Sequence, residues 1–205
     1  MNDTVHTEPL SRRKRRKEQT YRRLLQVAEA LFRSRGYDAT TVEEIAELAD
    51  VAKGTVFNYF DNKAGILRAI LFSRTQPLLQ SPPGADQPAP ERIHLLLTAL
   101  WQELAPYRHI ARRIAAYNLA QAEPEFPPVG VTLPSQALAH LIRQGQTQGH
   151  FRTDINAELA GELFATYFFH IFISTTHYKT NDNQTNSELL QQCLDLLYLG
   201  LYTNT

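Results

Sequence analysis

The fold of the chain is decided by residues 40–63, which read Thr-Thr-Val-Glu-Glu-Ile-Ala-Glu-Leu-Ala-Asp-Val-Ala-Lys-Gly-Thr-Val-Phe-Asn-Tyr-Phe-Asp-Asn-Lys. Four apolar residues of the first half recur at the spacing of one helix face, and they are Val42, Ile45, Ala46 and Ala49. Thr41 is followed three residues later by Glu44, which is a capping box, because each side chain can accept a hydrogen bond from the other residue's backbone N–H. The stretch therefore predicts a short amphipathic helix that starts after Thr41.

The second half predicts another short helix, over about residues 53–60, after a break at residues 50–52. Val56 and Phe60 are four residues apart, so they can anchor one face of this helix to a core. Two short helices joined by a tight turn form a helix-turn-helix, whose second helix enters the major groove of DNA.

The other face of the second helix carries groups that suit a base edge or a phosphate. Its polar side chains belong to Lys53, Thr55, Asn58 and Tyr59, and Gly54 permits close approach of the backbone. Asn pairs in bidentate fashion with adenine, and the methyl group of Thr contacts that of thymine. The alternative is an ordinary helical hairpin with a solvated polar face.

Residues 20–72 resemble the DNA-binding domain of the tetracycline-repressor (TetR) family. The matching residues are 28–36, Thr40, Thr41, Val42, Ile45, Ala46, Ala49, Val51, Lys53, Gly54, Thr55, Phe57, Tyr59, Phe60, Lys63, Ile66 and Leu67. The resemblance implies that Thr41 and Lys63 touch phosphates, and that the residues of the second helix face the bases or the nearby backbone. These expected DNA-binding residues are Lys53, Gly54, Thr55, Phe57, Asn58 and Tyr59.

Three residues depart from the family pattern. Asp50 stands where Gly is usual in the turn, although Asp tolerates the left-handed conformation better than most residues. Ala52 replaces the usual Ser or Thr, so the second helix loses a side-chain cap at a cost of about 1 kcal/mol. Phe57 replaces a common Tyr, so one hydroxyl that can bind a phosphate is absent.

Composition and charge bound the class of protein. An apolar content of 43% and a charged content of 20% are typical of a soluble globular protein. The single cysteine, Cys193, cannot form an intramolecular disulfide, and no secretory signal or membrane-spanning run is present, so we expect a cytoplasmic protein. The net charge of zero hides an excess of three positive charges in residues 1–72 (13 Lys and Arg against 10 Asp and Glu) and three negative charges in residues 73–205 (8 against 11).

The N-terminus is strongly basic. Within residues 11–23 there are eight Lys and Arg against Glu18 alone. We expect residues 1–17 to be a flexible arm that leads into a first helix, over about residues 18–35. Such an arm can bind phosphates or reach into a minor groove, and the equally weighted alternative is a solubilising tail.

The remainder of the chain predicts an all-α fold of about nine helices, with a DNA-binding domain over residues 18–75 and a second domain over residues 76–205. A fourth helix is expected over about 63–75. Five of the eleven prolines fall in residues 76–90 and mark the boundary. Apolar residues then recur at helical spacing in segments that we expect to be helices. They are residues 91–105, 110–117, 135–149, 154–178 and 187–202.

The last two predicted helices carry more apolar surface than a surface helix needs. A helix that is apolar on most of its circumference must be buried on two sides, which suggests a four-helix bundle between two subunits. The family resemblance also implies a homodimer formed by these helices, and the alternative is a monomeric core. The expected interface residues are Phe164, Phe168, Phe172, Leu190, Leu194 and Leu197.

The helices of the second domain also carry polar aromatic residues. In similar proteins they enclose a pocket for a small effector, and apolar walls with a few polar groups suit an apolar or aromatic molecule. The candidate lining residues are Trp101, Tyr107, Tyr117, His140, Tyr167 and His170. For each of them ordinary core packing is the alternative.

We expect no enzyme, no cofactor and no metal site, because the chain lacks a phosphate-binding Gly-rich loop, a His-Glu-x-x-His motif and a cysteine cluster. The leading hypothesis is a homodimeric repressor that binds a palindromic DNA operator and is released by a small molecule. Two alternatives stay open: an activator that needs no effector, and a small-molecule-binding protein with a vestigial helix-turn-helix.

Overall fold

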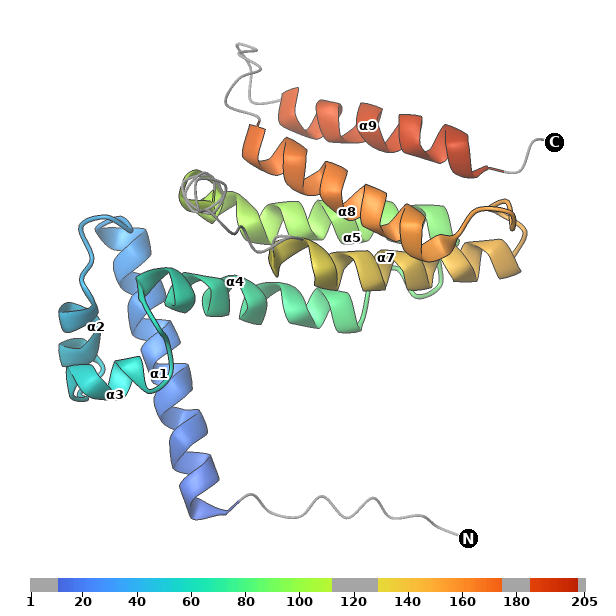
Figure 1. Cartoon of the computed structure of the whole chain (residues 1–205). Coiled ribbons are helices and arrows are strands. Elements are labelled where there is room, and N and C mark those ends of the chain that lie inside the picture. The colour runs from blue at the N-terminus through green and yellow to red at the C-terminus, as the bar shows by residue number, and fades with distance from the viewer. Residues whose placement is uncertain (1–10, 112–128, 175–184, 203–205) are drawn as a thin grey trace, which may run out of the picture. The chain divides into compact units, whose positions relative to one another are not determined.

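The computed structural model of the protein describes residues 11–111, 129–174 and 185–202, with the backbone alone at 129–133, 174, 185–190, 193 and 197. Within these residues, helices joined by loops and turns make up the fold. The helices are α1 (Arg12–Ser34), α2 (Val42–Leu48), α3 (Lys53–Phe57), α4 (Lys63–Gln80), α5 (Ala89–Leu104), the 3₁₀ helix η1 (Ala105–Tyr107), α7 (Val129–Thr147), α8 (Ala157–Ser174) and α9 (Thr185–Leu201) (Figure 1). The predicted all-α fold is confirmed. Most of the short helix expected near residues 110–117 lies outside the described residues.

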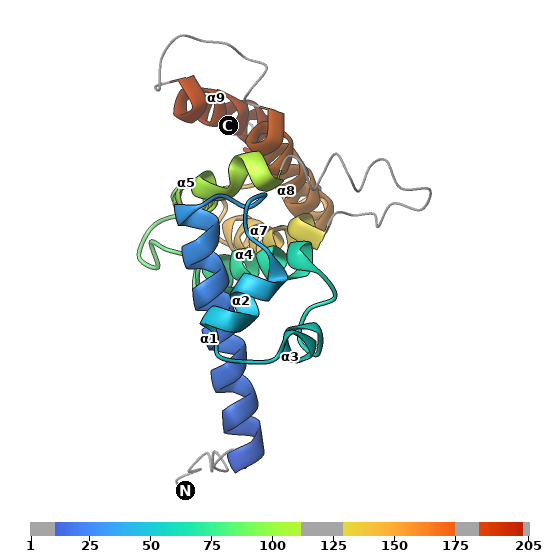
Figure 2. The same ribbon diagram turned by 90° about the vertical axis from the view of Figure 1, so that its left-hand side faces the viewer.

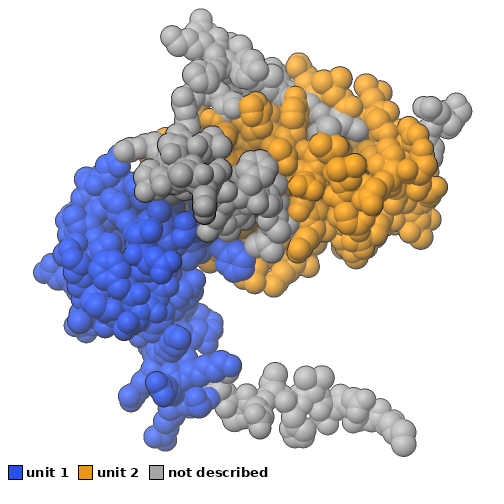
Figure 3. Space-filling model, in the orientation of Figure 1, with its two compact units in different colours: residues 1–72 blue, residues 73–205 orange. Residues whose placement is uncertain are grey.

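The chain separates into two compact units, residues 1–72 and residues 73–205 (Figure 3). The boundary predicted from the prolines lies three residues further along. None of the described helices combines the length and the apolar character that crossing a membrane requires.

The first unit is built on α1. In Figures 1 and 2, α2 and α3 lie together on one side of this long helix. Its core joins side chains from all four helices, each of them at most 6% exposed: Leu24, Ala28, Leu31, Phe32, Ile45, Ala46, Val56, Phe60, Ile66, Leu67 and Ile70. Burying a Leu, Ile or Phe side chain contributes about 1.5–3 kcal/mol, so this cluster holds two very short helices that could not persist alone.

The first helix starts earlier than predicted. It begins at Arg12, and the Ser11 hydroxyl caps it by accepting a hydrogen bond from the Lys14 N–H at 3.4 Å. The basic residues 12–17 are therefore helical, which corrects the expected flexible arm. Lys and Arg have high helix propensity, and the segment continues a helix already anchored by the core. Figures 1 and 2 show these first turns projecting beyond α3.

The helix-turn-helix forms with the predicted caps. The Thr41 side chain accepts from the Glu44 N–H, and the Glu44 carboxylate accepts from the Thr41 N–H, so the capping box is confirmed. At the other end of α2, the Val51 N–H donates to the Ala46 carbonyl and the Asp50 N–H to that of Glu47, both at 3.0 Å. This is a Schellman motif, and Asp50 takes the position usually held by Gly, at φ 54°.

The second helix has no side-chain cap, as predicted from Ala52. Ala52 has the extended backbone of an N-cap residue (φ −66°, ψ 146°), but no side chain caps α3. We expect Ala52→Thr to raise the free energy of unfolding by about 1 kcal/mol over Ala52→Val, because a Thr hydroxyl can accept from the first turn of α3. Chemical denaturation of the two nearly isosteric variants measures the difference. Equal stability would mean that this turn does not accept a side-chain cap.

Helix α4 runs past its predicted end near residue 75. It continues to Gln80 with Pro77 inside it. Proline lacks an N–H and removes one helical hydrogen bond, yet the helix resumes, and the Ser81 N–H donates to the Pro77 carbonyl at 3.0 Å. The Pro-rich loop is therefore shorter than expected.

The second unit is a helical layer structure in which α8 lies between α9 and the pair α5 and α7 (Figure 1). Its core is lined mainly by Leu, Ile and Phe side chains from α5, α7 and α8. A Cβ on Gly161 of α8 would lie 2.5 Å from the Ser135 carbonyl oxygen and 2.7 Å from the Ala139 nitrogen, both backbone atoms of α7. Glycine is thus required where α7 and α8 come closest.

Helix α9 is tied to α5 by a buried hydrogen bond. The Tyr198 hydroxyl donates to the Pro90 carbonyl at 2.9 Å, and burial raises the pKa of Tyr198 well above its ordinary value. The Tyr198 ring also packs against Phe151 and Phe164. These contacts fix which side of α9 faces the chain's own core.

Candidate nucleic-acid interface

Helix α3 presents its predicted polar face to solvent. The helix ends at Phe57, three residues before its predicted end at residue 60. Val56 on the helix and Phe60 in the turn after it are nevertheless both buried, as expected. The side chains of Lys53 and Asn58 are exposed, and Gly54 has open space where a Cβ would stand. An exposed short helix whose N-terminal half bears small and polar groups has the shape and chemistry needed to enter a major groove.

Two of the predicted contact residues on α3 interact with each other. The Lys53 ammonium lies 5.8 Å from the centroid of the Phe57 ring, and Phe57 is 44% exposed. Lys53 also forms an ion pair with Glu43 of α2, which lowers the pKa of the Glu43 carboxyl. Because both partners are more than half exposed, this pair can open at little cost and release the ammonium to a phosphate.

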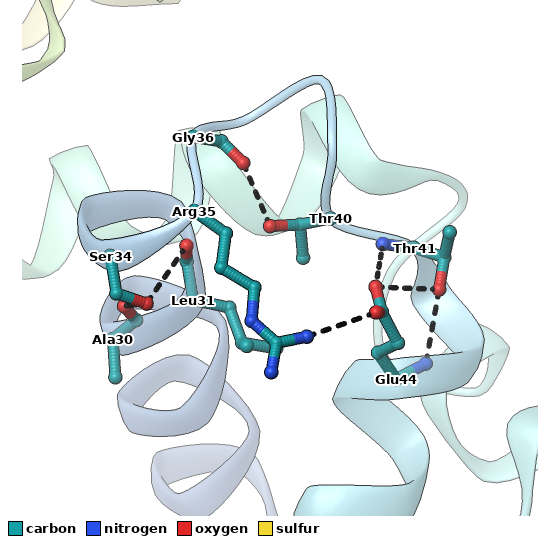
Figure 4. A network of polar contacts seen from close by, with 8 residues as sticks. All are labelled: Ala30, Leu31, Ser34, Arg35, Gly36, Thr40, Thr41 and Glu44. Atoms are coloured by element: carbon teal, nitrogen blue, oxygen red, sulfur yellow. Dashed lines mark hydrogen bonds and ion pairs between the residues drawn. The ribbon is translucent and has the colours of Figure 1, made fainter.

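Thr41 belongs to a network of polar contacts at the start of α2 (Figure 4). Its hydroxyl lies 3.0 Å from the Glu44 carboxylate, which also pairs with Arg35 at 3.2 Å. The hydrogen bonds from Thr41, followed by the charge of Arg35, lower the pKa of Glu44. The network fixes the first turn of α2, where the expected phosphate contact lies.

Two predicted contact residues are held inside the domain. The Tyr59 hydroxyl donates to the Lys17 carbonyl of α1 at 3.1 Å, and the Tyr59 ring packs against Tyr21. The Lys63 ammonium donates to backbone carbonyls of the loop between α1 and α2. Reading the sequence did not identify Tyr21, whose role depends on partners about forty residues away.

The basic end of α1 adjoins this surface. Because Tyr59 contacts α1 at Lys17, the first turns of α1 lie beside the end of the helix-turn-helix. The six consecutive Lys and Arg residues at positions 12–17 form the first turns of α1, and all six are exposed. Cations at the N-terminus of a helix oppose its dipole, so this end gains stability when an anion such as a phosphate is near.

In the second unit the predicted effector residues separate into two groups. Tyr107 is buried, and Trp101 packs edge-on against Phe168 and Phe172, at centroid distances of 6.2 and 5.6 Å. The side chains of His140, Tyr167 and His170 are exposed, and Tyr117 lies outside the described residues. Of the five predicted residues that are described, Trp101 and Tyr107 face the interior of this unit.

The predicted interface residues also need correction. Phe164, Phe168, Phe172 and Leu194 are at most 4% exposed within a single chain, where they fill the core, so they do not form a free face. Among the described side chains of α8 and α9, the exposed large apolar residues are others: Leu159 (57%), Leu163 (55%), Tyr167 (39%), Leu196 (66%) and Leu199 (73%). Leu190 and Leu197 lie in α9, and nothing is described of their side chains.

Comparison with known proteins identifies the first unit. The profile of the family described as "Bacterial regulatory proteins, tetR family" matches residues 24–70, which run from α1 into α4. The regulator TtgR of Pseudomonas putida is 39% identical over 62 residues, which are 30% of each chain. These matches coincide with the helix-turn-helix whose geometry is described above.

Two other proteins are similar over nearly the whole chain. The transcriptional repressor KstR2 of Rhodococcus jostii is 25% identical over 196 residues, which cover 87% of this chain and 89% of KstR2. The structure of Thermus thermophilus FadR, a TetR-family repressor in complex with lauroyl-CoA, is 25% identical and covers 90% of this chain and 96% of FadR, with a TM-score of 0.66. Residues 24–70 are therefore a DNA-binding domain of the TetR family, and the chain is similar to helix-turn-helix transcriptional repressors over nearly its whole length.

Proposed function

We propose that the protein is a ligand-responsive repressor that binds a palindromic operator as a homodimer in the cytoplasm. We also propose that it is a binding protein and not an enzyme. The observation that carries the proposal is the exposed face of α3, anchored from behind by Val56 and Phe60. In a two-fold dimer, two such helices read half-sites whose centres are about 34–36 Å apart, one turn of DNA.

The proposed dimer face consists of the exposed apolar side chains of α8 and α9. Leu159, Leu163 and Tyr167 follow each other at intervals of four residues, so they form one stripe along α8. Leu196 and Leu199 are the most exposed large apolar residues among the described side chains of α9. A second copy that covers these side chains would form a four-helix bundle and remove them from water.

The proposed effector is an apolar or aromatic molecule held by the second unit, near Trp101 and Tyr107. Long-chain acyl-CoA thioesters are the first class to test, because FadR of Thermus thermophilus, which covers 90% of this chain, was solved with lauroyl-CoA. An effector releases DNA only if it binds the non-DNA conformation more tightly.

Thermal unfolding tests the effector class directly. A ligand that binds only the folded state at 100 times its Kd stabilises it by about 2.7 kcal/mol, so lauroyl-CoA should raise the melting temperature by several degrees. Free coenzyme A and laurate are the matched controls for the two halves of the ligand. No shift with lauroyl-CoA, or an equal shift with laurate, would exclude an acyl-CoA effector while leaving DNA binding untouched.

Asn58 and Phe57 separate base reading from phosphate contact on α3. We expect Asn58→Ala to weaken operator binding by about 1–3 kcal/mol with little effect on unrelated DNA, because a lost base contact is sequence-specific. Phe57→Tyr should tighten both duplexes equally, by at most about 1.5–3 kcal/mol, because a hydroxyl bound to a phosphate carries no sequence information. Titration of both variants against operator and scrambled duplex measures the two effects.

The salt dependence of the Phe57→Tyr protein should stay that of the wild type, since a neutral hydroxyl displaces no counterion. A Phe57→Tyr protein that tightens only on operator, or not at all, would show that α3 docks in another orientation.

A further inference from the structure

Lys63, at the first position of α4, has an unusual set of partners for a residue expected to touch DNA. Its ammonium lies 2.7 Å from the Tyr37 carbonyl oxygen, 2.9 Å from that of Thr40 and 3.4 Å from that of Asp38. A lysine ammonium has three N–H donors, so these three oxygens can occupy all of them.

The surroundings of this ammonium are those of an internal contact. The Nζ atom also lies 4.4 Å from the centroid of the Tyr37 ring, so the cation has an aromatic face on one side and carbonyl oxygens on another. A contact with phosphate would require the ammonium to give up bonds that already satisfy it. That exchange costs more than opening the exposed ion pair between Lys53 and Glu43.

The carbonyls that Lys63 binds belong to the loop that sets the position of α2. Thr40 is 1% exposed, its hydroxyl donates to the Gly36 carbonyl at 2.8 Å, and its N–H donates to that of Tyr37 at 3.3 Å. The next residue is Thr41, the N-cap of α2 (Figure 4). One ammonium on α4 therefore holds the loop that aims the first turn of α2.

We propose that Lys63 is a positioning residue for DNA binding and not a phosphate ligand: it locks the loop of residues 37–40 to the start of α4 and so fixes α2 and α3 for the groove. This inference rests on the DNA-binding function of the first unit. It assigns to Lys63 a role different from that of an exposed cation.

Two substitutions distinguish the roles. Lys63→Met keeps the aliphatic stem and removes the charge, whereas Lys63→Arg keeps the charge but replaces the compact ammonium by a wide planar group that cannot reach the same three oxygens. The probe is a duplex enriched from a random-sequence pool by the wild-type protein. We expect both variants to bind it about tenfold more weakly, the loss caused by one misplaced base contact, with an unchanged salt slope.

The two other possible roles of Lys63 predict different results. A phosphate ligand predicts that Lys63→Arg binds like the wild type and that Lys63→Met lowers the salt slope by about 0.9. Reduced thermal stability with unchanged affinity in both variants would show a purely structural role, and it would also overturn the proposal. A wild-type protein that enriches no duplex would instead show that the DNA-binding function itself is wrong, before any variant is made.

A measurement on the wild-type protein avoids variants that fail to fold. Reductive methylation of lysines, read by mass spectrometry, should modify Lys63 much more slowly than Lys53 in the free protein. The enriched duplex should slow the reaction of Lys53 and leave that of Lys63 nearly unchanged. Protection of Lys63 in the free protein supports the contacts with the loop. If Lys63 reacts as fast as Lys53 in the free protein and becomes protected only on DNA, it is a phosphate ligand and the proposal fails.

Discussion

Leu163→Glu should convert a dimeric protein into a monomer and weaken operator binding by more than about a hundredfold. The side chain is 55% exposed at the centre of the α8 stripe, so a carboxylate there costs the monomer little. In a dimer the same charge would be buried against the other copy without a partner, which is strongly unfavourable. Two half-sites bound by linked subunits gain a factor of about 10²–10⁴, and that gain is lost with the dimer.

Leu95→Glu is the matched control for this substitution. Leu95 is also an exposed leucine of the second unit, 39% accessible, but it lies on α5 and not on the proposed face. We expect this variant to stay dimeric by sedimentation velocity and to bind DNA like the wild type. Leu199→Glu, on α9, should repeat the effect of Leu163→Glu. Dimers that survive both changes would place the interface elsewhere.

Removing three charges from one side of the α1 N-terminus should flatten the salt dependence of DNA binding, by about 2.7 in the slope of log K against log salt. Raising the salt from 50 to 200 mM should then weaken the binding of the variant roughly fortyfold less than it weakens the binding of the wild type. Arg13, Lys14 and Lys17 lie on the side of α1 that bears the Tyr59 contact, toward α3, because helical residues repeat every 3.6 positions. We therefore expect their Gln triple variant to show the effect.

A matched control removes three charges from the opposite side of the same turns, so that the net charge changes equally. Substitution of Arg12, Arg15 and Arg16 by Gln should change the slope by less than about 1, since these side chains would point away from the duplex. If both triple variants flatten the slope equally, the segment is not a helix on DNA. If neither alters the slope, it is a solubilising tail.

The helix-turn-helix could be read from the sequence because the signals that specify it are local. The Thr41–Glu44 capping box spans three residues, and Val56 and Phe60 are one helical turn apart, so neither requires knowledge of distant partners. The position of Asp50 in the turn also predicted a left-handed backbone, and Asp50 does adopt a positive φ. By contrast, Lys63 bonds to carbonyls 23 to 26 residues earlier, a relation that no local pattern reveals.

The second unit was harder to read because its helices are apolar on more than one side. On α8 the sequence indicated two buried faces but could not say which one meets the chain's own core. Phe164 and Phe168 turned out to fill that core, while Leu159 and Leu163 are exposed. At the N-terminus the density of basic residues suggested a flexible arm. Instead, the Ser11 cap and the buried remainder of α1 extend the helix through these cations.

The central claim is that this chain binds a specific DNA sequence through α3. An electrophoretic mobility shift tests this claim most directly. The DNA is the region upstream of the protein's own gene, with a scrambled duplex of the same length and composition as the control. We predict a complex of two chains on the upstream DNA at concentrations where the scrambled duplex stays free, with the preference lost in Asn58→Ala and the complex dissociated by lauroyl-CoA but not by coenzyme A. Equal binding to both duplexes by the wild-type protein, unchanged in Asn58→Ala, would contradict sequence reading by α3.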